Sequence, residues 1–122
     1  RGLGDVYKRQ IYYGRKRRVD VSAGTFAIDA GGNMPAQLTI TAKPSSSAAW
    51  FIRNIDTGEQ VKLSASTTSA STVRVDMALE RATVNSQAAA VTLDSDFFTV
   101  NGRTRLQLGN GSAVLEWRER WL

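Results

Sequence analysis

The sequence predicts an all-β domain, an antiparallel sandwich or barrel, on three grounds. Short stretches alternate apolar and polar residues with the period of two that a strand buried on one face requires. Turn signals and polar loops separate these stretches at intervals of roughly eight to twelve residues. The chain also lacks Cys, so the core must hold together without disulfides, which about 110 residues in a single domain can achieve.

Two stretches in the first half of the chain carry the clearest strand patterns. In residues 36–42 the sequence AQLTITA places Ala, Leu, Ile and Ala on one face and Gln, Thr and Thr on the other. Residues 50–63 predict a hairpin, because two alternating stretches flank a turn. Asn54, Thr57 and Gly58 shape that turn, since Gly accepts a positive φ and short polar side chains bond to the backbone of a turn.

Residues 73–84 are the one stretch in which a helix competes with strands. Met, Ala, Leu and Glu in its centre favour a helix, but Val and Thr at both ends favour strands. We therefore expect two strands that meet in a tight turn at residues 78–80. Asp76 lies where a short side-chain acceptor can hold this turn.

Residues 101–122 predict two further strands with a turn between them. Asn101 and Gly102 form a strong turn pair, and apolar and polar residues alternate after it. The Gly-Asn-Gly stretch at 109–111 predicts another turn, followed by the last strand. Adjacent residues of a strand face opposite sides, so only one of two neighbouring Phe residues can enter the core. The aromatic residues that we assign to the core are Phe97, Trp117 and Trp121.

The first ten residues, RGLGDVYKRQ, show no apolar period and fit the start of neither a helix nor a strand. Residues 5–10 match, codon for codon, the translation of a transposon end that is used to build sequencing libraries. We therefore expect residues 1–10 to be a disordered, non-native scar, which is set aside before the fold is considered. The native chain is expected to start near Ile11, already inside a longer protein.

The net charge of +5 comes from the N-terminal residues. Residues 1–18 hold seven of the 16 basic residues and one of the 11 acidic ones, which leaves nine basic and ten acidic residues and a net charge of −1 from Val19 onward. The run from Arg15 to Arg18 must therefore carry any nucleic-acid binding alone. The other interpretation of residues 11–23 is a basic linker or first edge segment, whose charges discourage strand pairing. We expect no specific nucleic-acid partner, and no apolar run is long enough to predict a membrane span.

The composition also excludes several kinds of catalytic site. Without His and Cys, the chain has no His general base, no Ser-His-Asp triad and no thiol nucleophile. A glycosidase needs two carboxylates across a cleft, but Asp94 and Asp96 flank Ser95 in a predicted turn, where they are expected to cap backbone N–H groups. Residues 29–33 and 94–96 lack the further oxygen ligands of a calcium loop. We expect no enzyme activity, no metal and no cofactor.

Five stretches occur in an order that is typical of one protein family. They are GGNMPAQLTI, FIRNIDTGEQVKL, VRVDMALERATV, LDSDFFTVNGRTRLQL and VLEWRERWL. In this order the sequence resembles the C-terminal domain of siphophage distal tail proteins and related phage minor tail proteins, and the resemblance covers residues 24–122. The residues with turn or structural roles in these stretches are Pro35, Asn54, Thr57, Gly58, Asp76, Asp96 and Gly102.

The resemblance implies a galectin-like or jelly-roll-like β-sandwich in residues 24–122 that belongs to a structural virion protein of the phage tail tip or baseplate. In this family an N-terminal domain builds a ring and the sandwich lies outside it. The resemblance therefore implies that the ring domain is missing here and that residues 11–23 lie at the junction. It also implies other tail or baseplate proteins as partners, a monomeric fragment, and hexamers only in the full-length protein.

The alternative function is a carbohydrate-binding module for host adsorption, in which exposed aromatic side chains stack on sugar rings. Trp50 and Phe51, beside the polar loop at 43–48, and Trp121 are the candidate stacking residues. A galectin-type site also needs a His beside Asn, Arg and Trp, and this chain has no His. A host glycan is therefore a weaker expectation than a tail protein.

Overall fold

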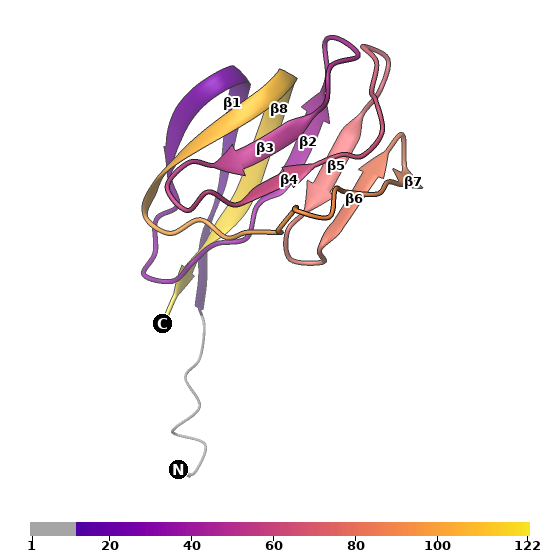
Figure 1. Cartoon of the computed structure of the whole chain (residues 1–122). Coiled ribbons are helices and arrows are strands. Elements are labelled where there is room, and N and C mark those ends of the chain that lie inside the picture. Colours follow the sequence, from indigo (N-terminus) through magenta and orange to yellow (C-terminus); the bar gives the residue numbers. More distant parts are fainter. Residues whose placement is uncertain (1–11) are drawn as a thin grey trace.

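The computed structural model describes residues 12–122, which form eight strands and no helix (Figure 1). No helix in this part of the chain could cross a membrane. The expectations for residues 1–10 and Ile11 lie outside the described residues. The strands are β1 (Tyr12–Asp29), β2 (Thr39–Lys43), β3 (Phe51–Asn54), β4 (Gln60–Lys62), β5 (Val73–Asp76), β6 (Arg81–Val84), β7 (Gln87–Ala88) and β8 (Arg103–Trp121).

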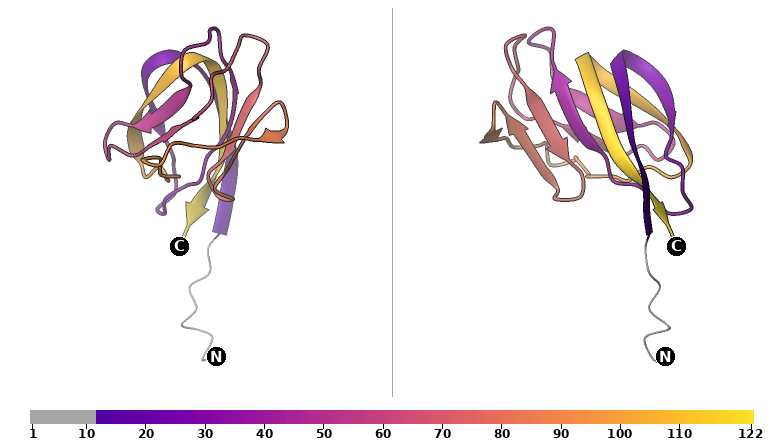
Figure 2. Two further views of the ribbon diagram at one scale, coloured as in Figure 1. Left: turned by 45° about the vertical axis from the view of Figure 1, so that its right-hand side comes forward. Right: turned by 180° about the vertical axis from the view of Figure 1, so that it is seen from behind.

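All strand pairs are antiparallel, which confirms the predicted all-β class. The strand order is β4-β3-β8-β2-β5-β6-β7, and β1 pairs with β8. The first part of β8 pairs with β3, where Ile52 lies opposite Leu108, and its second part pairs with β2, where Ile40 lies opposite Leu115. The two layers are therefore halves of one curled sheet, joined by the long strands β1 and β8 (Figures 1 and 2).

The predicted turn at residues 109–111 is wrong, because this Gly-Asn-Gly stretch lies inside β8. The register between β1 and β8 shifts at this point, so the extra residues of β8 bulge and bend the strand. Gly111 has a φ of 74°, and a Cβ on it would collide with the carbonyl oxygen of Lys43. The stretch does need glycine, but the chain bends here instead of reversing, because β1 stays paired on both sides of the bulge.

One apolar core fills the space between the two layers. The alternation predicted for residues 36–42 is confirmed, since every second residue is fully buried from Ala36 to Ala42. Ile52 from β3 and Val73 and Val75 from β5 enter the same core. The tight turn predicted between β5 and β6 is also present, so the helical propensity of residues 77–80 does not prevail over the flanking strands.

Strand β1 runs without a break from Tyr12 to Asp29. The domain boundary expected between residues 23 and 24 therefore falls inside a strand. Since β1 pairs with β8 alone, the basic run from Arg15 to Arg18 lies in an edge strand rather than in a linker. Within this run, Arg17 turns toward β8 and its Nε lies 3.2 Å from a carboxylate oxygen of Glu119.

Candidate functional site

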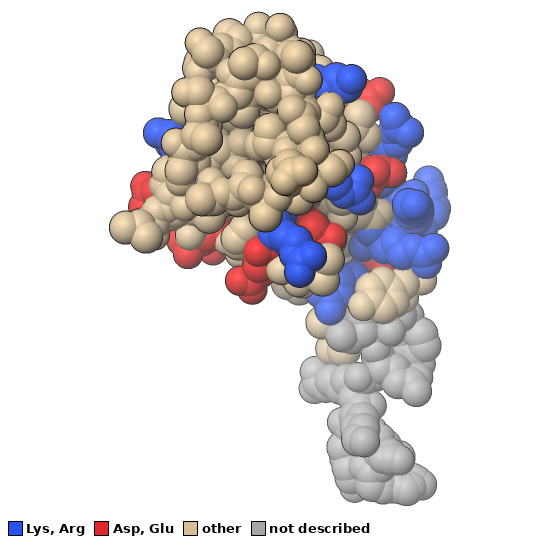
Figure 3. Space-filling model, turned by 90° about the vertical axis from the view of Figure 1, so that its right-hand side faces the viewer, with Lys and Arg blue, Asp and Glu red and all other residues tan. Residues whose placement is uncertain are grey.

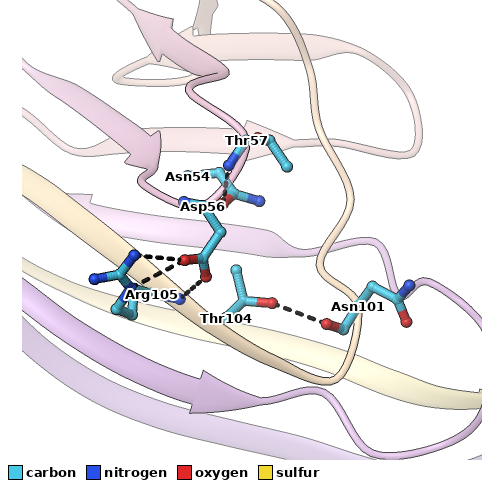
Figure 4. Close-up of polar contacts among 6 residues, drawn as sticks. All are labelled: Asn54, Asp56, Thr57, Asn101, Thr104 and Arg105. Carbon is cyan, nitrogen blue, oxygen red and sulfur yellow. Dashed lines mark hydrogen bonds and ion pairs between the residues drawn. The ribbon is translucent and has the colours of Figure 1, made fainter.

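The turn after β3 is built around the buried side chain of Asn54. Its Oδ1 accepts hydrogen bonds from the backbone N–H groups of Asp56 (3.0 Å) and Thr57 (3.2 Å). Its carbonyl oxygen accepts a third hydrogen bond from the N–H of Gly58 (2.7 Å), which has a φ of 82°. The structure thus brings three of the residues singled out in the sequence together in one turn, and Figure 4 shows Asn54 and Thr57 there.

Asp56, which belongs to the same predicted turn, ties this turn to β8. Its Oδ2 accepts a hydrogen bond from the backbone N–H of Arg105 (2.8 Å), and its Oδ1 accepts one from the Nε of the same residue (2.9 Å) (Figure 4). The backbone N–H of Arg105, followed by its side chain, lowers the pKa of Asp56 below the ordinary value of 3.8. The two residues are 49 positions apart, so no local pattern could have paired them.

We expect Asp56→Asn to lower the thermal midpoint by a few degrees at neutral pH, because the amide replaces an ionised acceptor of charge-assisted hydrogen bonds. The pKa of Asp56 is depressed in the folded chain, so the carboxylate contributes stability above its ordinary pKa of 3.8 and loses it as the pH falls through the lower folded value. The difference between the parent and the variant should therefore shrink at acidic pH. Thermal unfolding followed by circular dichroism at several pH values measures it.

Asp96→Asn is the control for this prediction. Its side chain is exposed and, among residues 12–122, forms no hydrogen bond or ion pair. The control should keep the midpoint of the parent at neutral pH. If Asp56→Asn lowers the thermal midpoint by the same amount at neutral and at acidic pH, the role assigned to the ionised carboxylate of Asp56 is contradicted.

Three other residues predicted to have structural roles lie in separate turns. The Oδ1 of Asp76 accepts hydrogen bonds from the N–H groups of Ala78 (3.0 Å) and Leu79 (3.1 Å), and so holds the turn between β5 and β6. The carbonyl of Pro35 accepts one from Nη1 of Arg120 (3.0 Å). Gly102 has a φ of 60° just before β8. These residues stabilise the scaffold at different places and do not converge on one site.

Two of the three aromatic residues assigned to the core belong to the last strand, and only one of them is buried. Trp117 is 7% exposed, and its Nε1 donates a hydrogen bond to the carbonyl of Ala30 (2.9 Å). Trp121 is 43% exposed, so its assignment to the core is wrong. At this end β8 extends beyond β2 and pairs with β1 alone, so no second layer covers the indole.

The assignment of Phe97 to the core is also wrong, because Phe98 takes that place. Phe98 is 2% exposed, whereas Phe97 only packs against the edge of the core. Val100 forms an isolated bridge with Ala36 and is fully buried. The alternation that turns Val100 inward turns Phe98 inward as well.

The candidate sugar-stacking residues do not form a binding surface. Trp50 is fully buried and cannot stack on a ligand. The ring of Phe51 packs against Gly109, and the guanidinium of Arg53 lies over the same ring, 5.3 Å from its centroid. Trp121 is exposed, but it lies at the far end of β8 from these residues, so the structure does not bring the three together.

The carboxylates of Asp94 and Asp96 do not form a catalytic pair. Asp94 accepts hydrogen bonds from the hydroxyl of Thr92 and from Nε2 of Gln60 (3.3 Å). The bond from Thr92 is the main cause that lowers its pKa, which is the wrong direction for a general acid. The backbone N–H of Asp94 itself is the second cause that lowers this pKa, whereas the side chain of Asp96 accepts no hydrogen bond among residues 12–122. The expected capping of backbone N–H groups is therefore seen at Asp94 alone of the two. Within residues 12–122 no group of three acidic side chains could hold a metal ion.

Comparison with known proteins gives the family. Residues 31–121 match the family described as siphovirus-type tail component, C-terminal domain. The fold is similar to that of the Dit protein of phage SPP1, described as a paradigm of the hub adsorption apparatus in phages that infect Gram-positive bacteria. The TM-score is 0.78 at 19% sequence identity, and the similarity covers 92% of this chain and 49% of the Dit chain. No curated protein matches the sequence significantly.

The family match extends over most of the described strands, from the loop after β1 to the end of β8. The similarity to Dit, which covers 92% of this chain, shows that the two proteins share this fold. The chain spans about half the length of that protein. The chain therefore belongs to the family of siphovirus-type tail component C-terminal domains and is a structural part of the tail of a siphovirus virion.

Proposed function

We propose that this chain is the outer domain of a distal tail protein and that it assembles the tail tip by binding neighbouring tail or baseplate proteins, without catalysing a reaction. The observation that carries the proposal is the family match over residues 31–121. The similarity to Dit, which leaves about half of that protein unmatched, supports a division of labour. In this division another part of the protein builds the ring, and the sheet described here presents its surface to partners.

The way in which the loops are held supports a role in binding. Asn110, in the bulge of β8, fixes the polar loop after β2. Its Oδ1 accepts a hydrogen bond from the N–H of Ser45 (3.0 Å), and its Nδ2 donates to the carbonyls of Ser46 (3.1 Å) and Ala48 (2.9 Å). Loops that are already ordered lose less conformational entropy when a partner binds. The side-chain bonds in this loop and in the turns after β3 and β5 therefore suit a rigid docking module.

We expect residues 12–122 to be monomeric in dilute solution, because the ring contacts are assigned to another part of the protein. Light scattering on this fragment measures its mass directly. The gene product extended to full length should form a hexamer under the same conditions. A stable hexamer formed by residues 12–122 alone would place the ring contacts in this sheet and contradict the division of labour.

A further inference from the structure

We propose that the outer face of the sheet half formed by β1, β8, β2, β5 and β6 is the docking surface for an acidic surface of a neighbouring tail protein. This inference rests on the proposed function and adds to it the face that is used and the chemistry of the partner. We call this surface the cationic face. Its cations are Lys16, Arg18, Lys43, Arg74, Arg81 and Arg118.

Strand alternation and register place these cations on one side of the sheet. Arg74 lies between the buried residues Val73 and Val75 and must therefore point outward. In the pairing of β1 with β8, Lys16 lies opposite Arg118, and Arg18, the next outward residue of β1, lies opposite Glu116. The right-hand view of Figure 2 shows this half of the sheet from outside. Figure 3 shows the same half from the side, and Lys and Arg side chains gather on the right of that view. The fold thus gathers Lys16 and Arg18 of the N-terminal basic run and four cations from the near-neutral part of the chain after Val19 into one basic surface.

The positive charge of the cationic face is only partly balanced. Among residues 12–122, no carboxylate oxygen lies within 4.0 Å of a charged nitrogen of Lys16, Arg74 or Arg118. Lys16 and Arg118 lie directly opposite each other in the register, and like charges in this arrangement destabilise a strand pair. An anionic partner would remove this repulsion when it binds.

The carboxylates on the cationic face either have partners already or are fewer than the cations around them. Asp76 accepts the two backbone hydrogen bonds of its own turn, and Asp20 lies 3.8 Å from Nε of Arg18. Glu116 is the one acidic side chain in the groove between Lys16, Arg74 and Arg118. The groove has a volume of about 340 Å³, and Tyr13, Trp117 and a further cation, Arg120, are also part of its lining.

The rims of the cationic face carry exposed apolar side chains. Tyr13, in β1, is 59% exposed, and Leu79, in the turn after β5, is 64% exposed. Leu79 lines a second depression together with Arg74 and Arg81. Arg and Tyr are enriched in the residues that dominate protein–protein binding, and charge complementarity sets partner choice. A groove of arginines between two exposed apolar side chains therefore fits the acidic surface of a protein.

Nucleic acid and a second copy of the chain fit this face less well. The carboxylates of Asp20 and Glu116 interrupt the cations, whereas a phosphate backbone carries negative charge along its whole length. A partner protein can instead place one of its own cations opposite Glu116. Two copies meeting through this face would bring cations against cations, which is costly.

The test uses the full chain and poly-L-glutamate as the acidic probe, with binding followed by the fluorescence anisotropy of labelled probe. The variant Arg74→Ser/Arg118→Ser removes two cations from the face, and Arg53→Ser/Arg103→Ser removes two exposed cations from β3 and the first part of β8. Both variants change the net charge equally. At about 0.1 M salt, charges farther than a Debye length of roughly 10 Å are screened. We expect the face variant to weaken binding about tenfold and the control variant less than about twofold.

A second pair of variants tests the face by a gain of affinity, which a folding defect cannot imitate. Glu116→Gln removes the carboxylate from the groove and should strengthen poly-L-glutamate binding by about two- to fivefold. Glu59→Gln, in the turn between β3 and β4, is the matched control and should leave the affinity unchanged. Thermal unfolding of each variant verifies that it folds.

Three results would overturn the proposal. The first is an equal loss of binding in the two arginine variants, or no binding at all. The second is tighter binding of a DNA duplex than of poly-L-glutamate, with the same loss in the face variant. The third is a dimer in light scattering that the face variant dissociates. Since no tail protein is present in these assays, a failure of the tail-tip role would leave their outcome unchanged, and the two failures can be told apart.

Discussion

Replacing Phe98 with alanine is expected to lower the free energy of unfolding by about 3–5 kcal/mol, the usual cost of truncating a buried aromatic side chain. Phe98 is 2% exposed and lies two residues before the bridge between Val100 and Ala36. This bridge pins the segment, so the layers cannot close over the cavity that the substitution leaves. Urea denaturation followed by tryptophan fluorescence measures the loss.

Phe97→Ala is the matched control, because it removes the same atoms one residue away. Its ring only packs against the edge of the core, so its loss should cost about 1–2 kcal/mol. Equal effects of the two substitutions, or a larger effect at Phe97, would contradict the assignment of Phe98 to the core.

Gly111→Ala is expected to lower the free energy of unfolding by about 2–5 kcal/mol. The left-handed backbone conformation, with a φ of 74°, costs a residue with a Cβ about 1–2 kcal/mol. The new Cβ would also collide with the backbone of Lys43 and Pro44, and relieving such a contact costs about 1–3 kcal/mol. The substitution acts at the bulge where β8 passes between the layers, so denaturation should report a loss for the whole domain.

Gly102→Ala separates these two costs. Gly102 has a similar φ of 60°, but a Cβ built on it meets no atom within 4 Å. The control should therefore lose only the backbone contribution of about 1–2 kcal/mol. If both substitutions cost the same, the close approach of β8 to the loop after β2 does not contribute to stability.

Much of the scaffold could be predicted from the sequence, because its determinants are local. The period of two in residues 36–42 identifies both the strand and the face that it buries. The Asn54 turn and the Asp76 turn follow from short side chains that bond to the backbone two or three residues away. Both features depend on residues that are neighbours in the chain.

The errors arose where contacts distant in the sequence decide the outcome. Whether residues 109–111 bend or reverse the chain depends on β1, about ninety residues earlier, which pairs with β8 on both sides of the bulge. Trp121 has the alternation of a core residue, but no strand of the other layer reaches it. The cationic face could not be predicted from the sequence for the same reason. Its cations come from β1, β2, β5, β6 and β8, and only the register of these strands places them on one face.

The position of the domain on the virion tests the central claim most directly. Antibodies raised against residues 12–122, applied with a gold label to particles of the siphovirus that encodes this sequence, can be located by electron microscopy. We expect the label at the tip of the tail, as the outer domain of a distal tail protein requires. Label on the capsid or along the tail tube, or no label on intact particles that contain the protein, would contradict this account.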